Sequence, residues 1–291
     1  MPLTAEHLTD EAVGTFRLGD GPTVRRLGFG AMRITGQGIW GPPEDRDEAK
    51  RVLRRAVELG VNLIDTADAY GPDVSEQLIA EALHPYPDDL VIATKGGLLR
   101  SGPGEWEPDG RPEHLREACD GSLRRLRLDA IELYQLHRPD PEVPFADSVG
   151  ALIELRDEGK IRHIGLSNVT VDQLAEALAM TEIVTVQNRY NLVDRDSEDV
   201  LEDCTRRGVG FIPWWPLAVG RLARTGGPLD EIAAAHDATP AQVALAWMLH
   251  RSPVMLPIPG TSSVEHLEEN LAAAQLDLSE DEVQRLGAAS G

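Results

Sequence analysis

Seven polar side chains stand where apolar, strand-like segments of the sequence come to an end. They are Asp65, Tyr70, Lys95, His137, Ser167, Asn168 and Gln187. Each of them alone has an ordinary explanation: an aspartate after a strand usually caps a turn, a lone lysine is usually solvated, and a lone histidine usually packs in the core. Seven at successive strand ends predict one shared site, provided that the fold brings those strand ends together.

Four of these residues form a combination that can move a proton. Asp65 and Lys95 are expected to pair, because a buried charge is costly without a partner. A lysine beside Tyr70 favours the phenolate and is expected to lower the tyrosine pKa. The hydroxyl then becomes a usable general acid near neutral pH. His137 can donate a hydrogen bond that orients a substrate carbonyl group.

The elements that must position these residues alternate between strand and helix patterns. The predicted strands are Gly28–Met32, Val61–Thr66, Leu90–Thr94, Ala130–Leu136, His163–Ser167, Ile183–Gln187, Gly210–Pro213 and Met255–Ile258. The predicted helices are Asp45–Leu59, Ser75–Leu83, Pro112–Leu126, Phe145–Glu158, Val171–Met180, Ser197–Arg207, one that opens at Thr239-Pro240, and Ser263–Ala274. A hairpin precedes them, with strands at residues 15–18 and 24–27. Ser279 and Glu282 form a capping-box start for a C-terminal helix.

Strands that alternate with helices predict parallel pairing with right-handed crossovers, in either a closed barrel or an open doubly wound sheet. An open dinucleotide-binding sheet would carry G-x-G-x-x-G after its first strand. Here Gly28 and Gly30 supply the first two glycines, and Arg33 stands at the third position. We therefore predict an α/β fold, a (β/α)8 TIM barrel with an N-terminal β-hairpin and a C-terminal extra helix. Residues 1–291 are predicted to form a single domain, with residues 1–11 as a frayed tail.

Composition excludes several classes of function. The net charge of −21 argues against nucleic acid and anionic membrane surfaces, since both would repel the chain. Cys119 and Cys204 form neither a disulfide framework nor a zinc pattern, which favours a reducing cytoplasm. No apolar run reaches membrane-spanning length. A metal-dependent barrel hydrolase is a weak alternative, because only His137 and His163 lie in predicted strands, and no metal is expected.

The segments around the four proton-moving residues resemble the aldo-keto reductase family. Asp65-Thr66-Ala67-x-x-Tyr70-Gly71, Thr94-Lys95 and Leu136-His137-Arg138-Pro139-Asp140 are similar to the segments that carry the family's catalytic tetrad. The resemblance runs from about Arg26 to Ala274, with the motifs in the family's order. It implies hydride transfer between a nicotinamide cofactor and a carbonyl compound. In that reaction Tyr70 is the proton donor, supported by Asp65, Lys95 and His137.

Other segments resemble those that hold the cofactor in this family. An amide-rich group of Ser167, Asn168 and Gln187 suits the nicotinamide carboxamide, which needs both a donor and an acceptor. Trp214 stands where the family usually has a tyrosine that stacks on nicotinamide; the alternative is an ordinary core residue. Arg221 either contacts phosphate or is a surface arginine. The complete set implied by the resemblance is Gly30, Met32, Ser167, Asn168, Gln187, Trp214, Pro216, Leu217, Gly220, Arg221, Gly260, Thr261, Ser262, His266, Glu269 and Asn270.

The last cofactor segment, residues 258–270, departs from the family's best-known pattern. It places hydroxyls and backbone N–H groups at a helix start, which is an anion site. Many NADPH-dependent members have lysine at the position of Gly260 and arginine at that of His266, and both cations would pair with the 2′-phosphate. Other branches with Pro-Gly-Thr here use NADPH, so the resemblance still favours NADP(H) over NAD(H). Glu269 and Asn270 match the pair that holds adenine.

Two tryptophans in loops are candidates for the wall of the substrate pocket. Trp40 lies in the loop 36–46 and Trp106 in the loop 101–110, and each either walls the pocket or simply packs within its loop. The residues in several motifs resemble those of bacterial YdbC-type pyridoxal reductases. This resemblance implies reduction of pyridoxal to pyridoxine. The alternatives are a ketoreductase for a sugar or specialised metabolite, and a nucleotide-sensing subunit with little turnover. The intact tetrad speaks against the second.

Overall fold

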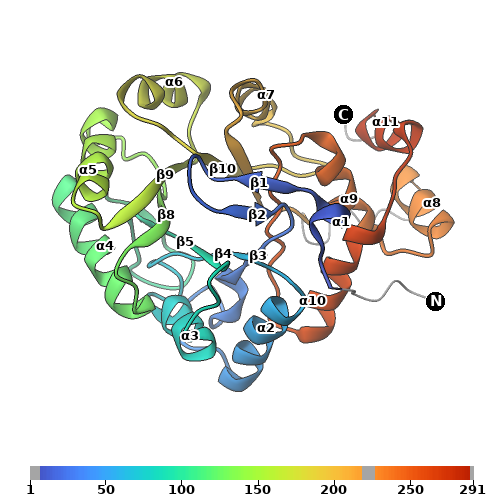
Figure 1. The fold of residues 1–291 in the computed structure, drawn as a ribbon, viewed down its shortest axis with the longest axis horizontal. Helices are drawn as coiled ribbons and strands as arrows, with labels where there is room; N and C mark the ends of the chain where they lie inside the picture. Colours follow the sequence, from blue (N-terminus) through green and yellow to red (C-terminus); the bar gives the residue numbers. More distant parts are fainter. Residues whose placement is uncertain (1–6, 218–226, 289–291) are drawn as a thin grey trace.

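A parallel sheet that curls into a barrel forms the centre of the molecule (Figure 1). The computed structural model describes residues 7–217 and 227–288, and within them the main sheet has seven strands in the order β11-β10-β9-β8-β5-β4-β3. These strands are β3 (Phe29–Gly30), β4 (Leu63–Asp65), β5 (Val91–Gly96), β8 (Ile131–Leu136), β9 (Ile161–Ser167), β10 (Thr185–Arg189) and β11 (Gly210–Trp214). Two short antiparallel pairs lie outside it: β1 (Thr15–Arg17) with β2 (Thr23–Arg25), and β6 (Leu98–Leu99) with β7 (Glu107–Pro108).

An eighth segment closes the sheet into a (β/α)8 barrel without forming a regular strand. On one side, the N–H of Phe211 donates to Val254 and the N–H of Leu256 donates back to Phe211, both at 2.8 Å. On the other side, the N–H of Gly28 donates to Pro257 at 2.9 Å. Residues 253–259 include three prolines, which have no N–H to donate. The predicted barrel is therefore confirmed, but its last predicted strand is only a bridging segment.

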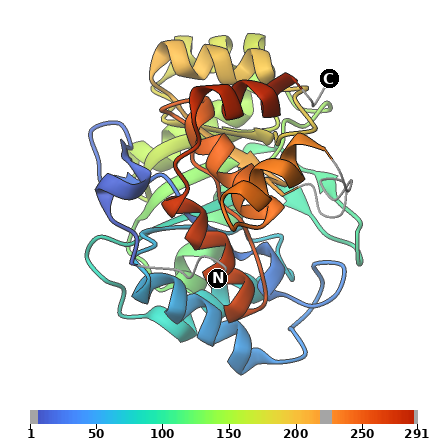
Figure 2. The same cartoon turned by 90° about the vertical axis from the view of Figure 1, so that its right-hand side faces the viewer.

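Helices surround the barrel, and all of the described ones except α1 and α8 were predicted in this order. They are α1 (Asp10–Val13), α2 (Arg46–Glu58), α3 (Val74–Leu83), α4 (Pro112–Leu126), α5 (Phe145–Asp157), α6 (Val171–Met180), α7 (Glu198–Arg207), α8 (Pro228–Ala235), α9 (Pro240–Arg251), α10 (Val264–Leu271) and α11 (Glu280–Ala288). Helices α4 and α6 have the predicted bounds. Helix α8 was not predicted, although Pro228 in its first turn is a start signal. Figure 2 shows α8 to α11 grouped on one side of the barrel.

Capping residues mark two of these helix starts as the sequence indicates. The Thr239 hydroxyl accepts the N–H of Gln242 at 3.3 Å, and the Gln242 amide oxygen accepts the N–H of Thr239 at 2.9 Å. This capping box opens α9. The Ser279 hydroxyl accepts the N–H of Glu282 at 3.3 Å, so the predicted C-terminal extra helix begins where its cap predicts.

The hairpin β1–β2 plugs one end of the barrel. Leu18 and Val24 are fully buried and belong to the same apolar cluster as the side chains inside the barrel. Those inner side chains come from β4, β5, β8 and β11, from Val184 just before β10, and from the closing segment: Leu63, Val91, Ala93, Leu133, Val184, Ile212, Leu256 and Ile258. In Figure 1 the hairpin crosses the centre of the ring of helices. The barrel is thus sealed at its N-terminal end, and only the C-terminal strand ends remain for a site.

The predicted frayed tail is wrong for those of its residues that the structure describes, 7–11. Leu8 is only 2% exposed, and its N–H donates to the carbonyl of Leu59 at 2.8 Å. Thr9 caps α1 by accepting the N–H of Ala12. Burial of one leucine side chain and a cap are enough to order this short segment.

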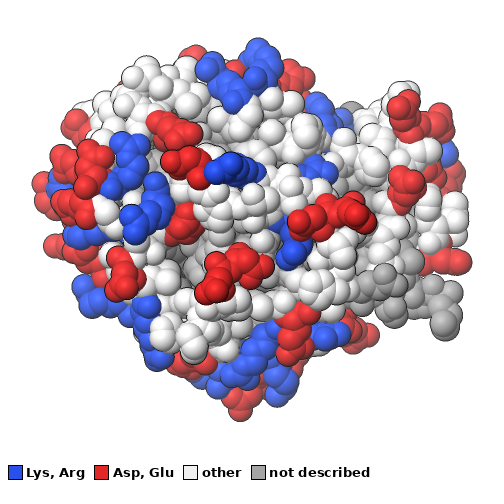
Figure 3. Space-filling model, viewed as in Figure 1, with Lys and Arg blue, Asp and Glu red and all other residues white. Residues whose placement is uncertain are grey.

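Charges of both signs are interspersed on the face that carries the hairpin (Figure 3). The excess of acidic residues therefore does not gather into a single acidic patch on this face. Among the described residues, no helix combines the length and apolar character needed to cross a membrane.

His163 on β9 ties the hairpin turn to the barrel. Its Nε2 lies 3.2 Å from Asp20 of the turn, and its Nδ1 lies 3.1 Å from the carboxylate of Glu132 on β8. A Cβ on Gly21 would lie 2.3 Å from the imidazole, so the turn needs glycine for this close approach. The hydrogen bond to Glu132 raises the pKa of His163; burial opposes this, and Asp20 adds to it.

This histidine makes stability depend on pH. Because its folded-state pKa is raised above about 6.5, its contribution is complete below that pH and is lost as pH rises through the folded pKa. We expect His163→Gln to lower Tm more at about pH 5.5 than at about pH 8.5. His250→Asn, at an exposed position, is the control and should show no such difference. Thermal unfolding across pH tests this; an equal loss at both pH values would contradict it.

Candidate active site

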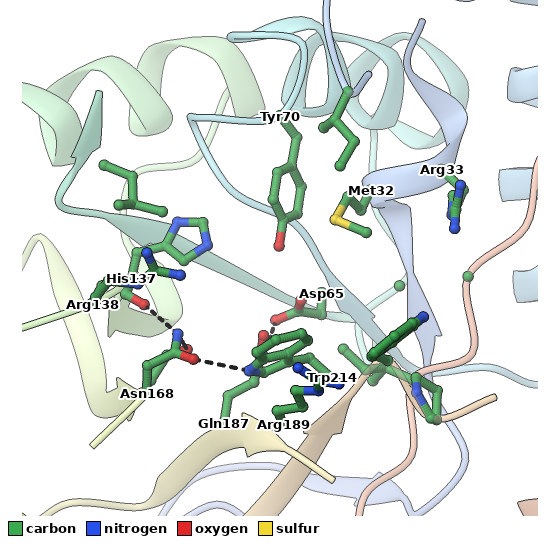
Figure 4. Close-up of a pocket in the computed structure, with 18 of the residues that line it drawn as sticks. Met32, Arg33, Asp65, Tyr70, His137, Arg138, Asn168, Gln187, Arg189 and Trp214 are labelled. Carbon is green, nitrogen blue, oxygen red and sulfur yellow. Dashed lines mark hydrogen bonds between the residues drawn. The ribbon is translucent and has the colours of Figure 1, made fainter. Parts of the chain in front are cut away.

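A cavity of about 490 Å³ opens at the C-terminal ends of the barrel strands (Figure 4). Its lining combines aromatic and apolar side chains with a few convergent polar groups, as small-molecule sites do. The lining residues are Gly30, Met32, Arg33, Ile39, Asp65, Tyr70, Leu98, Trp106, His137, Arg138, Ser167, Asn168, Gln187, Arg189, Trp214, Trp215, Pro216, Leu217, Ile258 and Gly260.

A buried ion pair forms the floor of the site. Lys95 Nζ lies 2.6 Å from Asp65 Oδ1 and donates to the carbonyl of Thr66 at 2.8 Å. Lys95 is fully buried and Asp65 is 2% exposed. Burial works to lower the pKa of Lys95, but the charge of Asp65 and the nearby Tyr70 raise it overall. Lys95 therefore keeps its proton inside the barrel, as the predicted pairing requires.

Two glutamines hold the second oxygen of this carboxylate. Gln187 Nε2 donates to Asp65 Oδ2 at 2.9 Å, and Gln135 Nε2 donates to the same atom at 3.1 Å. Lys95 and Gln135 are direct partners in the β5–β8 register. The sequence analysis missed Gln135, although a glutamine inside an otherwise apolar strand was a usable signal. Neutral amide donors stabilise the carboxylate without adding a charge.

Tyr70 projects its hydroxyl toward this pair. The Oη atom lies 3.4 Å from Lys95 Nζ, and the ring is 6% exposed. The expected lowering of the tyrosine pKa is wrong for this structure: burial raises the pKa of Tyr70, Lys95 lowers it, and Asp65 raises it further. Desolvation of the phenolate outweighs the neighbouring ammonium group. At neutral pH Tyr70 therefore carries its proton.

His137 faces Tyr70 across the cavity. The two ring centroids are 5.7 Å apart, with an interplanar angle of 81°. Burial lowers the pKa of His137 well below its ordinary value, and the charges of Lys95 and Arg138 lower it further. The imidazole is therefore neutral, with one nitrogen able to donate a hydrogen bond. Its Nδ1 has no partner among the described residues.

An amide-rich group lies beside this tetrad at the ends of β9 and β10. Asn168 Nδ2 donates to the carbonyl of His137 at 3.0 Å and to the Ser167 hydroxyl at 2.9 Å. The indole N–H of Trp214 donates to Asn168 Oδ1 at 3.1 Å. Asn168 has a φ of 59°, a left-handed conformation that asparagine tolerates better than most residues. The structure thus brings the tetrad, the amides and Trp214 to one cavity.

Residues 26–290 match the model of the Aldo/keto reductase family. The chain belongs to the aldo/keto reductase family. It is therefore an oxidoreductase of the class that interconverts small carbonyl compounds and alcohols. Its fold agrees, since it superposes on an aldo-keto reductase from Klebsiella pneumoniae in complex with NADPH, with a TM-score of 0.79 and 29% identity. That match covers 95% of this chain and 95% of the other.

Two curated relatives of this aldo/keto reductase are more similar in sequence. An uncharacterized oxidoreductase of Schizosaccharomyces pombe is 53% identical over 273 residues, which cover 94% of this chain and 89% of the relative. Pyridoxine 4-dehydrogenase of Escherichia coli is 46% identical over 279 residues, which cover 94% of this chain and 96% of the relative. The likeness is therefore to whole proteins rather than to a shared fragment.

Two facing glycines explain why this aldo/keto reductase has no lysine at position 260. A Cβ on Gly260 would lie 2.5 Å from the carbonyl oxygen of Gly30, and a Cβ on Gly30 would lie 2.6 Å from that of Ile258. Any side chain at either position would therefore displace backbone. The nearby Arg33 lines the cavity, and its Cγ lies 3.7 Å from the position of a Cβ on Gly260.

Some residues expected at the cofactor site are not among the residues that line this cavity. These are Thr261, Ser262, His266, Glu269 and Asn270, which belong to the segment that leads into and through α10. Ser263 caps α10 by accepting the N–H of His266. Gly220 and Arg221 lie outside the described residues.

The two candidate tryptophans of the substrate pocket have different positions. Trp106 lines the cavity, and its ring lies edge-to-face with Tyr70 and His137, each at a centroid distance of 6.3 Å. Trp40 is not among the described residues that line this cavity, and its role in the substrate pocket stays a prediction; its ring packs on the guanidinium of Arg100 at 5.7 Å. The sequence alone could not distinguish the two tryptophans, because both lie in loops that were predicted to lie at the mouth of the barrel.

Other lining residues were not predicted. They are Arg33, Ile39, Leu98, Arg138, Arg189, Trp215 and Ile258. Arg33 and Arg138 immediately follow predicted site residues, so sequence adjacency could have found them. Among the described residues, no group of three or more histidine, cysteine or carboxylate side chains is arranged to hold a metal ion.

Breaking the buried ion pair should cost more stability than removing it. Lys95→Met leaves Asp65 buried without its cation and is expected to lower the free energy of unfolding by about 3–5 kcal/mol. Asp65→Asn combined with Lys95→Met removes both charges and should restore part of that loss. Urea unfolding of the two single variants and the double variant measures the coupling. A double variant whose loss equals the sum of the single losses would contradict the expectation.

Proposed function

We propose that this chain is an NADP(H)-dependent aldehyde reductase in which Tyr70 donates the proton, and that pyridoxal is a substrate that it reduces to pyridoxine. The observation that carries the proposal is a protonated Tyr70 hydroxyl, 3.4 Å from a buried, charged Lys95 and beside a neutral His137. A carbonyl oxygen placed between Tyr70 and His137 would meet two hydrogen-bond donors. This is the arrangement that stabilises negative charge on a carbonyl oxygen as it is reduced.

The cavity offers the groups that a nicotinamide cofactor needs. Ser167, Asn168 and Gln187 combine hydroxyl and amide donors and acceptors for its carboxamide. Trp214 presents an aromatic ring on the same wall (Figure 4). The close backbone approach at Gly30 and Gly260 leaves no side chain between the strand ends. These features fit a flat amide-bearing ring next to Tyr70.

Each residue of the site has a separate role in the proposed reduction of the carbonyl group. The nicotinamide ring, when bound, supplies a hydride to the carbonyl carbon of the substrate. Tyr70 gives its hydroxyl proton to the carbonyl oxygen, which completes the alcohol. The phenolate left on Tyr70 is stabilised by the charge of Lys95, and Asp65 holds Lys95 in place. His137 orients the carbonyl oxygen, and the buried floor excludes water from the transfer.

Aromatic walls support an aromatic aldehyde as the substrate. Tyr70, His137 and Trp106 form a set of edge-to-face contacts on one side of the cavity, and Trp214 and Trp215 contribute to the lining. Flat rings pack well against such surfaces. The 46% identical relative from Escherichia coli is a pyridoxine 4-dehydrogenase, which acts on the alcohol of the same pair of compounds. Pyridoxal is therefore the first substrate to test.

Tyr70→Phe tests the assignment of the proton donor. The variant keeps the ring contacts but has no proton to give, so kcat for pyridoxal with NADPH should fall by at least about a hundredfold. Binding of NADPH, measured by fluorescence titration, should stay within about twofold of the wild type.

Tyr134→Phe is the matched control for this variant. Tyr134 is fully buried on β8, and its hydroxyl has no partner among the described residues. Its loss should leave turnover intact. The enzyme proposal fails if wild-type protein binds NADPH but reduces neither pyridoxal nor 4-nitrobenzaldehyde. The assignment of Tyr70 fails if Tyr70→Phe retains wild-type kcat.

Arg33 supports the preference for NADP(H). It lines the cavity beside Gly260, and none of the described carboxylates pairs with it, so its charge is available to a phosphate. Arg33→Met should raise Kd for NADPH by about tenfold, or about 1.4 kcal/mol, and change Kd for NADH much less. Paired titrations measure both values. Equal losses for the two cofactors would instead indicate contact with a phosphate that they share.

A further inference from the structure

One arginine joins the loops that form the mouth of the cavity. Arg100 follows β6, and all three of its guanidinium nitrogens donate to backbone carbonyl oxygens. The acceptors are Glu105 at 2.7 Å, Ala69 at 2.9 Å, Ile39 at 3.0 Å, Gly38 at 3.1 Å and Gly102 at 3.3 Å. These carbonyls belong to three segments: the loop after β3, the turn before Tyr70, and the loop between β6 and β7. Backbone hydrogen bonds also join these segments: the N–H of Gly71 donates to Ile39 at 3.3 Å, and the N–H of Gly104 donates to Gly38 at 3.3 Å. Arg100 adds side-chain hydrogen bonds to all three segments at once.

Arg100 also covers one face of Trp106. Its Cζ lies 3.6 Å from the centroid of the indole ring, and the ring of Trp40 lies on it at 5.7 Å. No described carboxylate lies within ion-pair distance of Arg100, although the chain has 49 acidic residues. Its guanidinium N–H groups therefore donate to loop carbonyls rather than to a carboxylate.

Through its contact with Trp106, Arg100 influences the positions of side chains in the active site. Trp106 lies edge-to-face with Tyr70 at 84° and with His137 at 66°. Ile39, whose carbonyl accepts from Arg100, also lines the cavity. The guanidinium group therefore fixes two wall residues that come from different loops.

We propose that Arg100 is a specificity-determining positioning residue that sets the width of the substrate pocket for a flat aromatic carbonyl compound. The proposal rests on the proposed function, since it names how the same site selects its substrate. Arg100 is not among the described residues that line the cavity, and it acts through Trp106 and Ile39, which are. A substrate that reaches Trp106 depends on it, whereas a short aliphatic aldehyde that reacts beside Tyr70 does not.

Only arginine meets the geometric demands of this position. Its planar fork carries five donors and can stack on an indole ring at the same time. Lysine has three donors around one point and no planar face. Arg100→Lys is therefore expected to behave much like Arg100→Met, which removes the donors and keeps the length of the side chain.

Arg26 provides a matched control at the other end of the barrel. Its guanidinium also bonds only to backbone carbonyls of separate segments: Val13 at 2.9 Å, Leu249 at 3.1 Å and Ser252 at 2.9 Å. It lies beside the hairpin, far from the cavity in the fold. Arg26→Met should therefore lower Tm and leave the ranking of substrates unchanged.

The experiment compares kcat and KM of wild type, Arg100→Met, Arg100→Lys and Arg26→Met for pyridoxal and for propanal, with NADPH saturating. For both Arg100 variants we expect KM for pyridoxal to rise by about tenfold or more, with propanal changed by less than about threefold. For Arg26→Met, kcat and KM for both aldehydes should match those of the wild type. The inference is overturned if pyridoxal and propanal lose activity by the same factor, or if neither changes.

Hydrogen exchange gives a measurement that does not depend on turnover. Arg100→Met should increase exchange in segments 36–41 and 101–106, while Arg26→Met should not. Unchanged exchange in these segments would overturn the inference even for a fully active enzyme. If the wild type reduces neither aldehyde, the proposed function fails, and the exchange result alone decides whether Arg100 orders the mouth.

Discussion

The structure depends on placing one charge pair, Lys95 with Asp65, inside a barrel that excludes water. Two buried charges are costly unless every remaining hydrogen-bonding group near them is satisfied. Here the second carboxylate oxygen takes amide N–H groups from Gln135 and Gln187, and the ammonium group also donates to the carbonyl of Thr66. These donors and acceptors come from β4, β5, β8 and β10. The pair therefore requires four strands in correct register, and only a closed barrel supplies them.

The two ends of the barrel have different roles: the N-terminal end is packed and closed, and the C-terminal end carries the candidate active site. At the N-terminal end, Leu18 and Val24 of the hairpin complete an apolar interior, and His163 fastens the turn to the sheet. At the C-terminal end, the same strands finish in polar residues around an open cavity. This separation lets loops at the mouth vary without disturbing the core.

Close backbone packing limits how this enzyme can hold an anionic cofactor. Gly30 and Gly260 approach so closely that neither can carry a side chain without moving the backbone. In the proposed complex with NADP(H), a cation for the 2′-phosphate would then come from a neighbouring position, and Arg33 lines the cavity beside Gly260. The same cavity raises the pKa of Tyr70 and lowers that of His137, because burial disfavours the charged form of each. Both groups are thereby set as neutral hydrogen-bond donors.

Periodic apolar patterns and cap residues, which are local properties of the chain, predicted the alternation of strands and helices around the barrel and the bounds of α4 and α6. The tetrad was predicted from the resemblance of its motifs to the aldo-keto reductase family. The sequence analysis missed α1 and α8 and did not show that prolines reduce the last strand to a bridging segment. The sequence analysis therefore recovered local features of the chain.

Only the tertiary structure decided which groups contact one another and how deeply they are buried. Gln135 became a partner of Asp65 only through the β5–β8 register. Burial reversed the expected pKa shift of Tyr70, and the contacts of Arg100 with loop carbonyls at the mouth had no signal in the sequence. Distances between side chains from different strands, and the solvent excluded around them, are set by packing and leave little trace in local sequence.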